Sequence, residues 1–245
     1  VHEHYGPSQM ILSAAGDVDH EAIVRAAEEL FGGLESRVAS VPTKALFQGG
    51  VRREIKSLEQ AHFALAFEGP GYCDNAIYTA QIYSVALGGG MSSRLFQEVR
   101  EKRGLCYTIF AQTGAYSDTG MMTIYAGTSG EQLPELASIT MQELARAADD
   151  MNETEVARAR AQMKAGMLMG LESPSSRAER LARLMQIWNR IPLLEETVAQ
   201  IDAVTMQGVR DFAASLADEA PAALALYGPV ERAPDLADLL KDRAA

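Results

Sequence analysis

Residues 86–107 read Ala86-Leu-Gly-Gly-Gly-Met-Ser-Ser-Arg-Leu-Phe-Gln-Glu-Val-Arg100-Glu-Lys-Arg-Gly-Leu-Cys-Tyr107, and the interpretation of the fold starts from this stretch. Three consecutive glycines follow an apolar helical pattern over residues 75–87 and mark its end. A second helix is predicted from about Ser92 to Lys102. Gly-Leu-Cys-Tyr then leads into alternating residues typical of a strand. The stretch therefore predicts a helix, a glycine loop, a helix and a strand.

Strand patterns lie on both sides of this unit, and helix patterns dominate most of the chain after it. Alternating residues predict strands at 51–57 and 62–67, and a pair at 106–115 and 121–127 joined by a turn. Helical periodicity follows, and a last strand is predicted at 222–227. Because most strands come early and most helices late, the order favours an α+β fold. In such a fold an antiparallel sheet has its helices packed on one face.

The first part of the chain follows a pattern of its own. The apolar stretch at residues 10–18 predicts a buried strand that ends at the glycine, Gly16. Asp19 is the expected N-terminal cap of the helix that follows. Residues 35–48 lose periodicity, contain a proline and are predicted to be a linker.

A strand, Gly-x-Val and a helix occur twice, since Leu12-Ser-Ala-Ala-Gly16-Asp-Val18 resembles Leu224-Ala-Leu-Tyr-Gly228-Pro-Val230. Such repetition indicates a duplicated domain, although chance similarity is the alternative. The predicted organisation is the terminal strand and helix of a truncated domain in 1–34, a linker in 35–48 and one complete domain in 49–245. The strand and helix of 1–34 are expected to pack against that domain or another chain, because their apolar run would otherwise be an exposed edge.

Charge and composition exclude some classes of function. The 245 residues include 22 Lys and Arg against 33 Asp and Glu, a formal net charge of −11, which argues against nucleic acid as a partner. No apolar run is long enough to span a membrane and no signal peptide is visible, so a cytoplasmic location is the default expectation. Cys73 and Cys106 match no metal-binding spacing and are predicted to be buried or half-buried thiols.

The histidines do not form a recognisable metal-binding motif. They are His2, His4, His20 and His62. None lies in His-x-x-Glu-His or His-Glu-x-x-His, and the spacing of the first two does not place both on one face of a helix. No metal site is therefore expected in this chain.

Four features of residues 86–107 together resemble the C-terminal domain of pitrilysin/insulinase zinc metallopeptidases. They are the glycine triplet, Ser-Arg-Leu-Phe, an arginine seven residues before a tyrosine, and Gly-Leu-x-Tyr. That family includes mitochondrial processing peptidase, and the resemblance extends over essentially the whole chain. It implies the processing-peptidase metallohydrolase fold, with one full copy and the end of a preceding copy. It also implies that an N-terminal domain holds the zinc and the glutamate that acts as general base.

In that family an arginine and a tyrosine with this spacing contact the peptide near the scissile bond, which implies this role for Arg100 and Tyr107. An arginine fork and a phenol are suitable donors for a developing oxyanion. The residues alone equally allow Arg100 to cap a helix and Tyr107 to be a half-buried strand residue.

The glycines of the triplet have two interpretations. They are Gly88, Gly89 and Gly90. They fit no phosphate-binding pattern and predict a turn with positive φ between two helices. The family resemblance implies in addition that this loop borders the peptide path.

The resemblance implies that the chain is the C-terminal, substrate-binding half of a zinc-dependent endopeptidase that cleaves peptides or unfolded segments. It is expected to be inert without the zinc-bearing half. The alternative is a non-catalytic subunit that supplies the arginine and tyrosine to a zinc-bearing partner. The expected cofactor of the intact enzyme is zinc, and the expected partners are a peptide and an N-terminal domain or partner subunit, with a dimer as the assembly.

Overall fold

The computed structural model describes residues 6–35, 42–217 and 220–242. The chain divides into two compact units. The smaller unit comprises residues 1–44 and 165–197, and the larger unit comprises residues 45–164 and 198–245.

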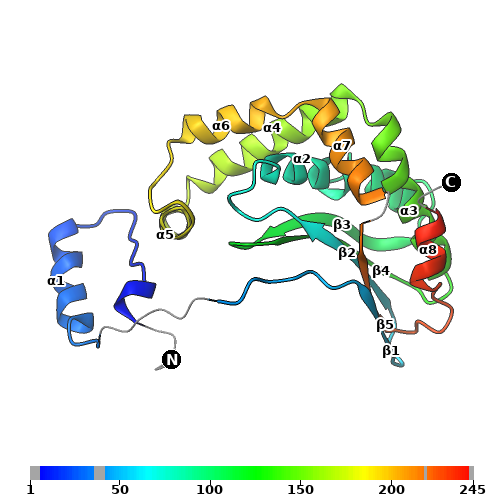
Figure 1. Ribbon diagram of the computed structural model, residues 1–245, viewed down its shortest axis with the longest axis horizontal. Coiled ribbons are helices and arrows are strands. Elements are labelled where there is room, and N and C mark those ends of the chain that lie inside the picture. The colour runs from blue at the N-terminus through cyan, green and yellow to red at the C-terminus, as the bar shows by residue number, and fades with distance from the viewer. Residues whose placement is uncertain (1–5, 36–41, 218–219, 243–245) are drawn as a thin grey trace. The chain divides into compact units, whose positions relative to one another are not determined.

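The larger unit is built on a five-stranded sheet with strand order β1-β5-β2-β4-β3 (Figure 1). The strands are β1 (Gly50–Ile55), β2 (Ala61–Gly69), β3 (Cys106–Ala115), β4 (Gly120–Thr128) and β5 (Ala222–Gly228). All neighbouring strands pair antiparallel except β1 and β5, which pair in parallel. The exception arises because β5 lies between β1 and β2, two consecutive strands that run in opposite directions. Since β5 is antiparallel to β2, it must be parallel to β1.

Helices of the larger unit cover one face of this sheet (Figure 1). The helices are α2 (Ile77–Gly88), η2 (Phe96–Glu101), α3 (Leu133–Asp150), α4 (Glu153–Gly170), α6 (Leu194–Ala203), α7 (Met206–Ala217) and α8 (Leu236–Asp242), of which α4 and α6 extend partly into the smaller unit. The core lies between α2, α3, α7 and the sheet, where Phe63, Leu65 and Ile124 are at most 1% exposed. The predicted α+β architecture, with helices on one face of the sheet, is confirmed.

The smaller unit contains η1 (Pro7–Gln9), α1 (His20–Phe31) and α5 (Pro174–Trp188). The predicted cap of α1 is present, since the Ala22 amide donates to Asp19 Oδ1 at 2.7 Å. No residue of α1 is buried. The expectation that this segment packs on the second domain or on another chain therefore stays a prediction. Part of the predicted linker, residues 36–41, lies outside the described residues, and the predicted domain limits stay predictions as well.

The two segments that resemble each other in sequence share the same turn. Gly16 and Gly228 have φ of +121° and +109°, and in each case the valine two residues later donates its amide to the glycine carbonyl, at 3.1 and 2.9 Å. They differ before the glycine, because residues 222–228 form β5 while residues 10–15 form no strand. The predicted buried strand is wrong, and Leu12 is 61% exposed. An extended segment becomes a strand only when a neighbouring strand pairs with its backbone, and no described strand pairs with residues 10–15.

None of the helices in the described ranges is both long and apolar enough to cross a lipid bilayer.

Candidate functional site

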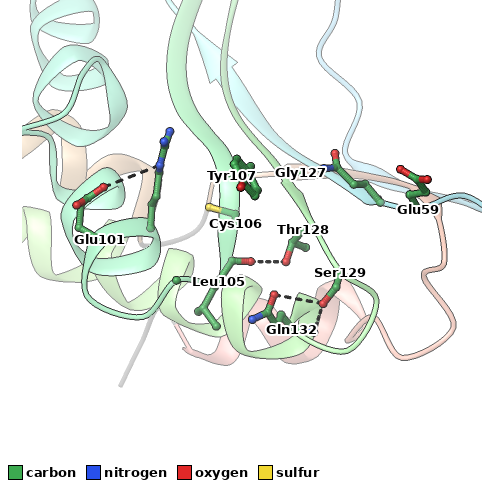
Figure 2. Close-up of a pocket in the computed structure, with 12 residues that line it drawn as sticks. Glu59, Glu101, Leu105, Cys106, Tyr107, Gly127, Thr128, Ser129 and Gln132 are labelled. Atoms are coloured by element: carbon green, nitrogen blue, oxygen red, sulfur yellow. Dashed lines mark hydrogen bonds and ion pairs between the residues drawn. The ribbon is translucent and has the colours of Figure 1, made fainter.

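A cavity of about 470 Å³ opens where η2 ends and β3 begins (Figure 2). Its walls come from the β1–β2 loop, the end of η2, the start of β3, the end of β4 and the turn before α3. The lining residues are Glu59, Gln60, Arg100, Glu101, Gly104, Leu105, Cys106, Tyr107, Gly127, Thr128, Ser129 and Gln132. Both residues singled out in the sequence, the arginine and the tyrosine, therefore face the same space.

Arg100 lies near the end of η2, which is π-helical: the Lys102 amide donates to the Gln97 carbonyl, five residues back, at 2.9 Å. The guanidinium carbon of Arg100 lies 4.7 Å from the centroid of the Phe96 ring, a cation–π contact that orients the planar group. The nearest carboxylate is that of Glu101, 3.9 Å from Arg100 Nε and beyond hydrogen-bonding distance. Packing on Phe96 and this one long ion pair orient the guanidinium, and no hydrogen bond within the described part of the chain occupies its donors.

A tight reversal joins Arg100 to β3. Gly104 has φ of +65°, a conformation that disfavours residues with a Cβ, and its amide donates to the Arg100 carbonyl at 3.0 Å. The next residue, Leu105, is buried and its amide donates to the Val99 carbonyl at 3.0 Å. The hydroxyl of Thr128 on β4 donates to the Leu105 carbonyl. The reversal is therefore attached to the sheet, and it sets where the chain turns from η2 into β3.

Tyr107 is the extra residue of a β-bulge. Cys106 pairs with Thr128 and Thr108 pairs with Gly127, so Tyr107 has no partner position on β4. Bulges change the direction of a side chain and are frequent beside functional sites. The ring is 80% exposed, which rules out the half-buried strand position that the sequence also allowed. β3 is an edge strand of the sheet, so its outer backbone groups are unpaired within the sheet.

The cavity contains charges of both signs. In Figure 2 the carboxylates of Glu101 and Glu59 lie on opposite sides of Tyr107. Cys106 is half-buried beside it, and burial raises the pKa of its thiol to about 11, although the nearby Arg100 lowers it in part. The thiol is therefore protonated near neutral pH and is no nucleophile there. Cys73, by contrast, is exposed, which corrects the prediction that it is buried or half-buried.

The glycine triplet does not line this cavity. None of its three residues has a positive φ, so the predicted conformational reason for glycine there is wrong. A Cβ on Gly88 would lie 2.4 Å from the Ala111 backbone nitrogen on β3, and one on Gly90 would lie 3.3 Å from Gln162 Nε2. Gly88 is needed because α2 and β3 approach each other closely at that point. The suggested role of the triplet in a peptide path stays a prediction.

The two described histidines lie on different elements. His62 lies on β2, where its Nδ1 is 2.8 Å from the Tyr125 hydroxyl, and His20 begins α1. His2 and His4 lie outside the described residues. Within the described ranges no three His, Cys, Asp or Glu residues are grouped so that they could hold a metal ion. These residues do not fit a zinc site.

Six lining residues lie outside the stretch 86–107, and sequence reasoning singled out none of them: Glu59, Gln60, Gly127, Thr128, Ser129 and Gln132. Glu59 and Gln60 lie in the β1–β2 loop, and no motif marks them. Ser129 and Gln132 carry a weak signal, because Ser-x-x-Gln before a helix is typical of a capping turn. The Gln132 amide indeed donates to Ser129 Oγ at 3.2 Å. Only the fold brings these residues beside Arg100 and Tyr107.

Comparison with known proteins places the chain in a family. Residues 1–163 match the family described as the peptidase M16 inactive domain. The chain belongs to this family. The chain is 37% identical over 195 residues to an uncharacterized zinc protease of Rickettsia bellii, covering 79% of this chain and 47% of that protein. It is 33% identical over 231 residues to the uncharacterized zinc protease YmxG of Bacillus subtilis, covering 94% and 56%.

The M16 inactive domain also resembles a solved structure. A chain of complex III2 from Candida albicans, with Inz-5 bound, superposes with a TM-score of 0.82 at 22% identity, over 93% of this chain and 57% of that one. This likeness bears on the fold alone. The chain spans about half the length of the two zinc protease relatives.

Proposed function

We propose that this chain is the substrate-binding half of a zinc-dependent endopeptidase that cleaves peptides or unfolded segments. Zinc and the general base would come from an N-terminal domain or a partner subunit, since the described residues do not fit a zinc site. The observation that carries the proposal is that Arg100 and Tyr107, from two different elements, line one cavity beside an edge strand. Relatives named zinc proteases support the class of reaction.

The proposed work of this chain is binding and charge stabilisation. An extended peptide would lie along the free edge of β3, where backbone hydrogen bonds hold it independently of its sequence. Arg100 and Tyr107 would donate hydrogen bonds to the peptide carbonyl that gains negative charge as the scissile bond is attacked. Donors that are already oriented stabilise such a charge without reorganising, and losing one typically lowers kcat by about 10²–10³-fold.

The test uses the chain alone and together with the zinc-bearing domain or subunit that completes it, with a quenched fluorescent peptide as substrate. The chain alone should not cleave, and the completed protein should. Arg100→Ala and Tyr107→Phe should each lower kcat by about 10²-fold or more with a smaller change in KM, because they act mainly in the transition state.

Matched controls exist on the same surface. Arg103 lies in the reversal that follows Arg100, but it binds Glu98 and does not line the cavity, so Arg103→Ala is the control for Arg100→Ala. Tyr116 follows the far end of β3 and is 60% exposed, so Tyr116→Phe is the control for Tyr107→Phe. Both should keep normal kcat. Cleavage by the chain alone, or full activity of Arg100→Ala in the completed protein, would refute the proposal. If the zinc-bearing component is a separate polypeptide, the chain is instead the non-catalytic subunit.

A further inference from the structure

One face of α4 holds the loop that connects α2 to η2. Gln162 Nε2 donates to the Gly89 carbonyl at 2.8 Å, and Arg158 Nη2 donates to the Ser92 carbonyl at 2.9 Å. The third residue of this face, Glu155, accepts hydrogen bonds from Arg94, which lies in the first turn of the helix after the loop. Glu155, Arg158 and Gln162 follow the i, i+3, i+7 spacing that aligns side chains along one side of a helix. Two of these contacts therefore hold the loop, and the third holds the first turn of the helix that follows it.

The strongest of these contacts is made by Arg94, the first helical residue before η2. Its Nε and Nη2 donate to the two carboxylate oxygens of Glu155 at 2.7 and 2.8 Å, and its Nη1 donates to Asp150 at the end of α3. The side chain of Arg94 is 10% exposed and that of Glu155 is 13% exposed. Glu155 is itself fixed, because it accepts the Asn152 amide at 2.9 Å in the capping box of α4. The bidentate pair is thus held between two rigid helix ends.

The charges of this cluster favour the ionised carboxylates. Burial acts to raise the pKa of Glu155 and of Asp150, but the hydrogen bonds and charge of Arg94 outweigh it, and both pKa values lie below the ordinary range. An arginine is suited to this place because its planar fork matches a carboxylate in two bonds, which a lysine ammonium cannot do.

Arg94 and Arg100 belong to one short helical segment. The segment packs through Leu95 and Val99, which are both fully buried, and it ends in the reversal at Gly104. A displacement of its first turn therefore moves Arg100 as well. Within this segment, Arg94 is the residue that ties the first turn to α3 and α4 by ion pairs.

We propose that Arg94 is a positioning residue for Arg100: its ion pairs with Glu155 and Asp150 set the place of η2, and so the place of the Arg100 guanidinium in the cavity. The inference rests on the proposed function of Arg100. It assigns the Ser-Arg-Leu-Phe segment a task that is separate from contact with substrate, because Arg94 does not line the cavity.

The experiment compares Arg94→Lys with the control Arg146→Met in the completed protein. Arg146 binds the same Asp150, together with Glu143, and among the described residues it forms no hydrogen bond or ion pair with the loop or with η2. Arg94→Lys should lower kcat by about 10- to 100-fold with little change in KM, since misplacing a catalytic group by about 1 Å costs up to 10²-fold. Arg146→Met should change kcat less than twofold.

A double-mutant cycle separates positioning from a general loss of structure. In the Arg100→Ala background, Arg94→Lys should cause no further loss of kcat, because the group that it positions is gone. An equal loss in both backgrounds, or normal kcat in Arg94→Lys, would overturn the inference. If Arg94→Lys does not fold, Glu155→Gln replaces it, since it keeps the arginine and weakens one side of the pair. Normal kcat in Arg100→Ala would instead refute the proposed function itself.

Discussion

Replacing Gly88 with alanine tests the reason for the glycine at the end of α2. The new Cβ would lie 2.4 Å from the Ala111 nitrogen, 2.8 Å from the Ala111 Cβ and 3.0 Å from the Phe110 carbonyl carbon. Favourable carbon contacts begin at about 3.5 Å, so α2 and β3 must separate by several tenths of an ångström or more. Two of these neighbours are backbone atoms of β3 and the third, the Ala111 Cβ, is bonded directly to that backbone, so none of them can move aside by a side-chain rotation.

The expected cost follows from two opposing effects. Overpacking in a dense core costs about 1–3 kcal/mol, and contact with the backbone of a strand favours the upper end. Alanine gains roughly 0.5–1 kcal/mol over glycine in a helix. The net loss of unfolding free energy is therefore about 2 kcal/mol, which lowers Tm by roughly 4–8 °C in a unit of this size.

Urea unfolding followed by far-UV circular dichroism measures the loss, with Gly90→Ala as the control in the same loop. The nearest atom to a Cβ on Gly90 is the amide nitrogen at the end of the flexible Gln162 side chain, at 3.3 Å, which needs to shift by only a few tenths of an ångström and can keep its hydrogen bond to the Gly89 carbonyl. Gly90→Ala should stay within about 0.5 kcal/mol of the wild type because the neighbouring group can move. Equal urea midpoints for the two variants would refute the close-approach explanation.

Three further predictions concern thiols, a buried hydroxyl and a pair of carboxylates. The exposed Cys73 should react with a disulfide reagent at pH 8 at least about tenfold faster than Cys106, whose pKa is raised to about 11 by burial. Reaction rates of single-cysteine variants measured across pH 7–10 check this prediction. Faster reaction of Cys106 would contradict it. Tyr83 is fully buried and its hydroxyl has no partner among the described residues, so Tyr83→Phe should raise the unfolding free energy by about 1 kcal/mol in urea titration, and a loss of similar size would show that the hydroxyl is bonded. The pKa values of Asp150 and Glu155 are lowered in the folded protein, so their contribution to stability is complete above about pH 4.5 and is lost as pH falls through the lowered values. The wild type should therefore lose more unfolding free energy between pH 6 and pH 3 than Glu155→Gln does. Parallel curves of unfolding free energy against pH for the two proteins would contradict this linkage.

Sequence patterns determined much of the local structure. Periodicity and glycines predicted the strands and the first helices of the larger unit closely, and the predicted Asp19 cap of α1 is present in the smaller unit. These features are local: each depends on residues within three or four positions of one another, so the sequence contains the whole cause. The short stretch with Arg100 and Tyr107 also indicated the family from its residues alone.

Other features depend on which segments become neighbours. The strand expected at residues 10–15 is absent because a strand needs a partner, and the partner is not specified by local sequence. The parallel pairing of β1 with β5 has the same origin, because β5 comes from the far end of the chain. Gly88 is required by the approach of β3, not by its own φ.

The candidate site shows the same division between local and tertiary causes. The sequence by itself determined that an arginine and a tyrosine stand seven positions apart in a helix–turn–strand unit. Only the tertiary structure decided that a π-helical segment, a positive-φ Gly104 and a bulge at Tyr107 bring both side chains to one cavity. It also decided that Arg94 meets Glu155 and Asp150, about 60 residues away along the chain. Such contacts follow from packing a loop against a distant helix, which no local pattern encodes.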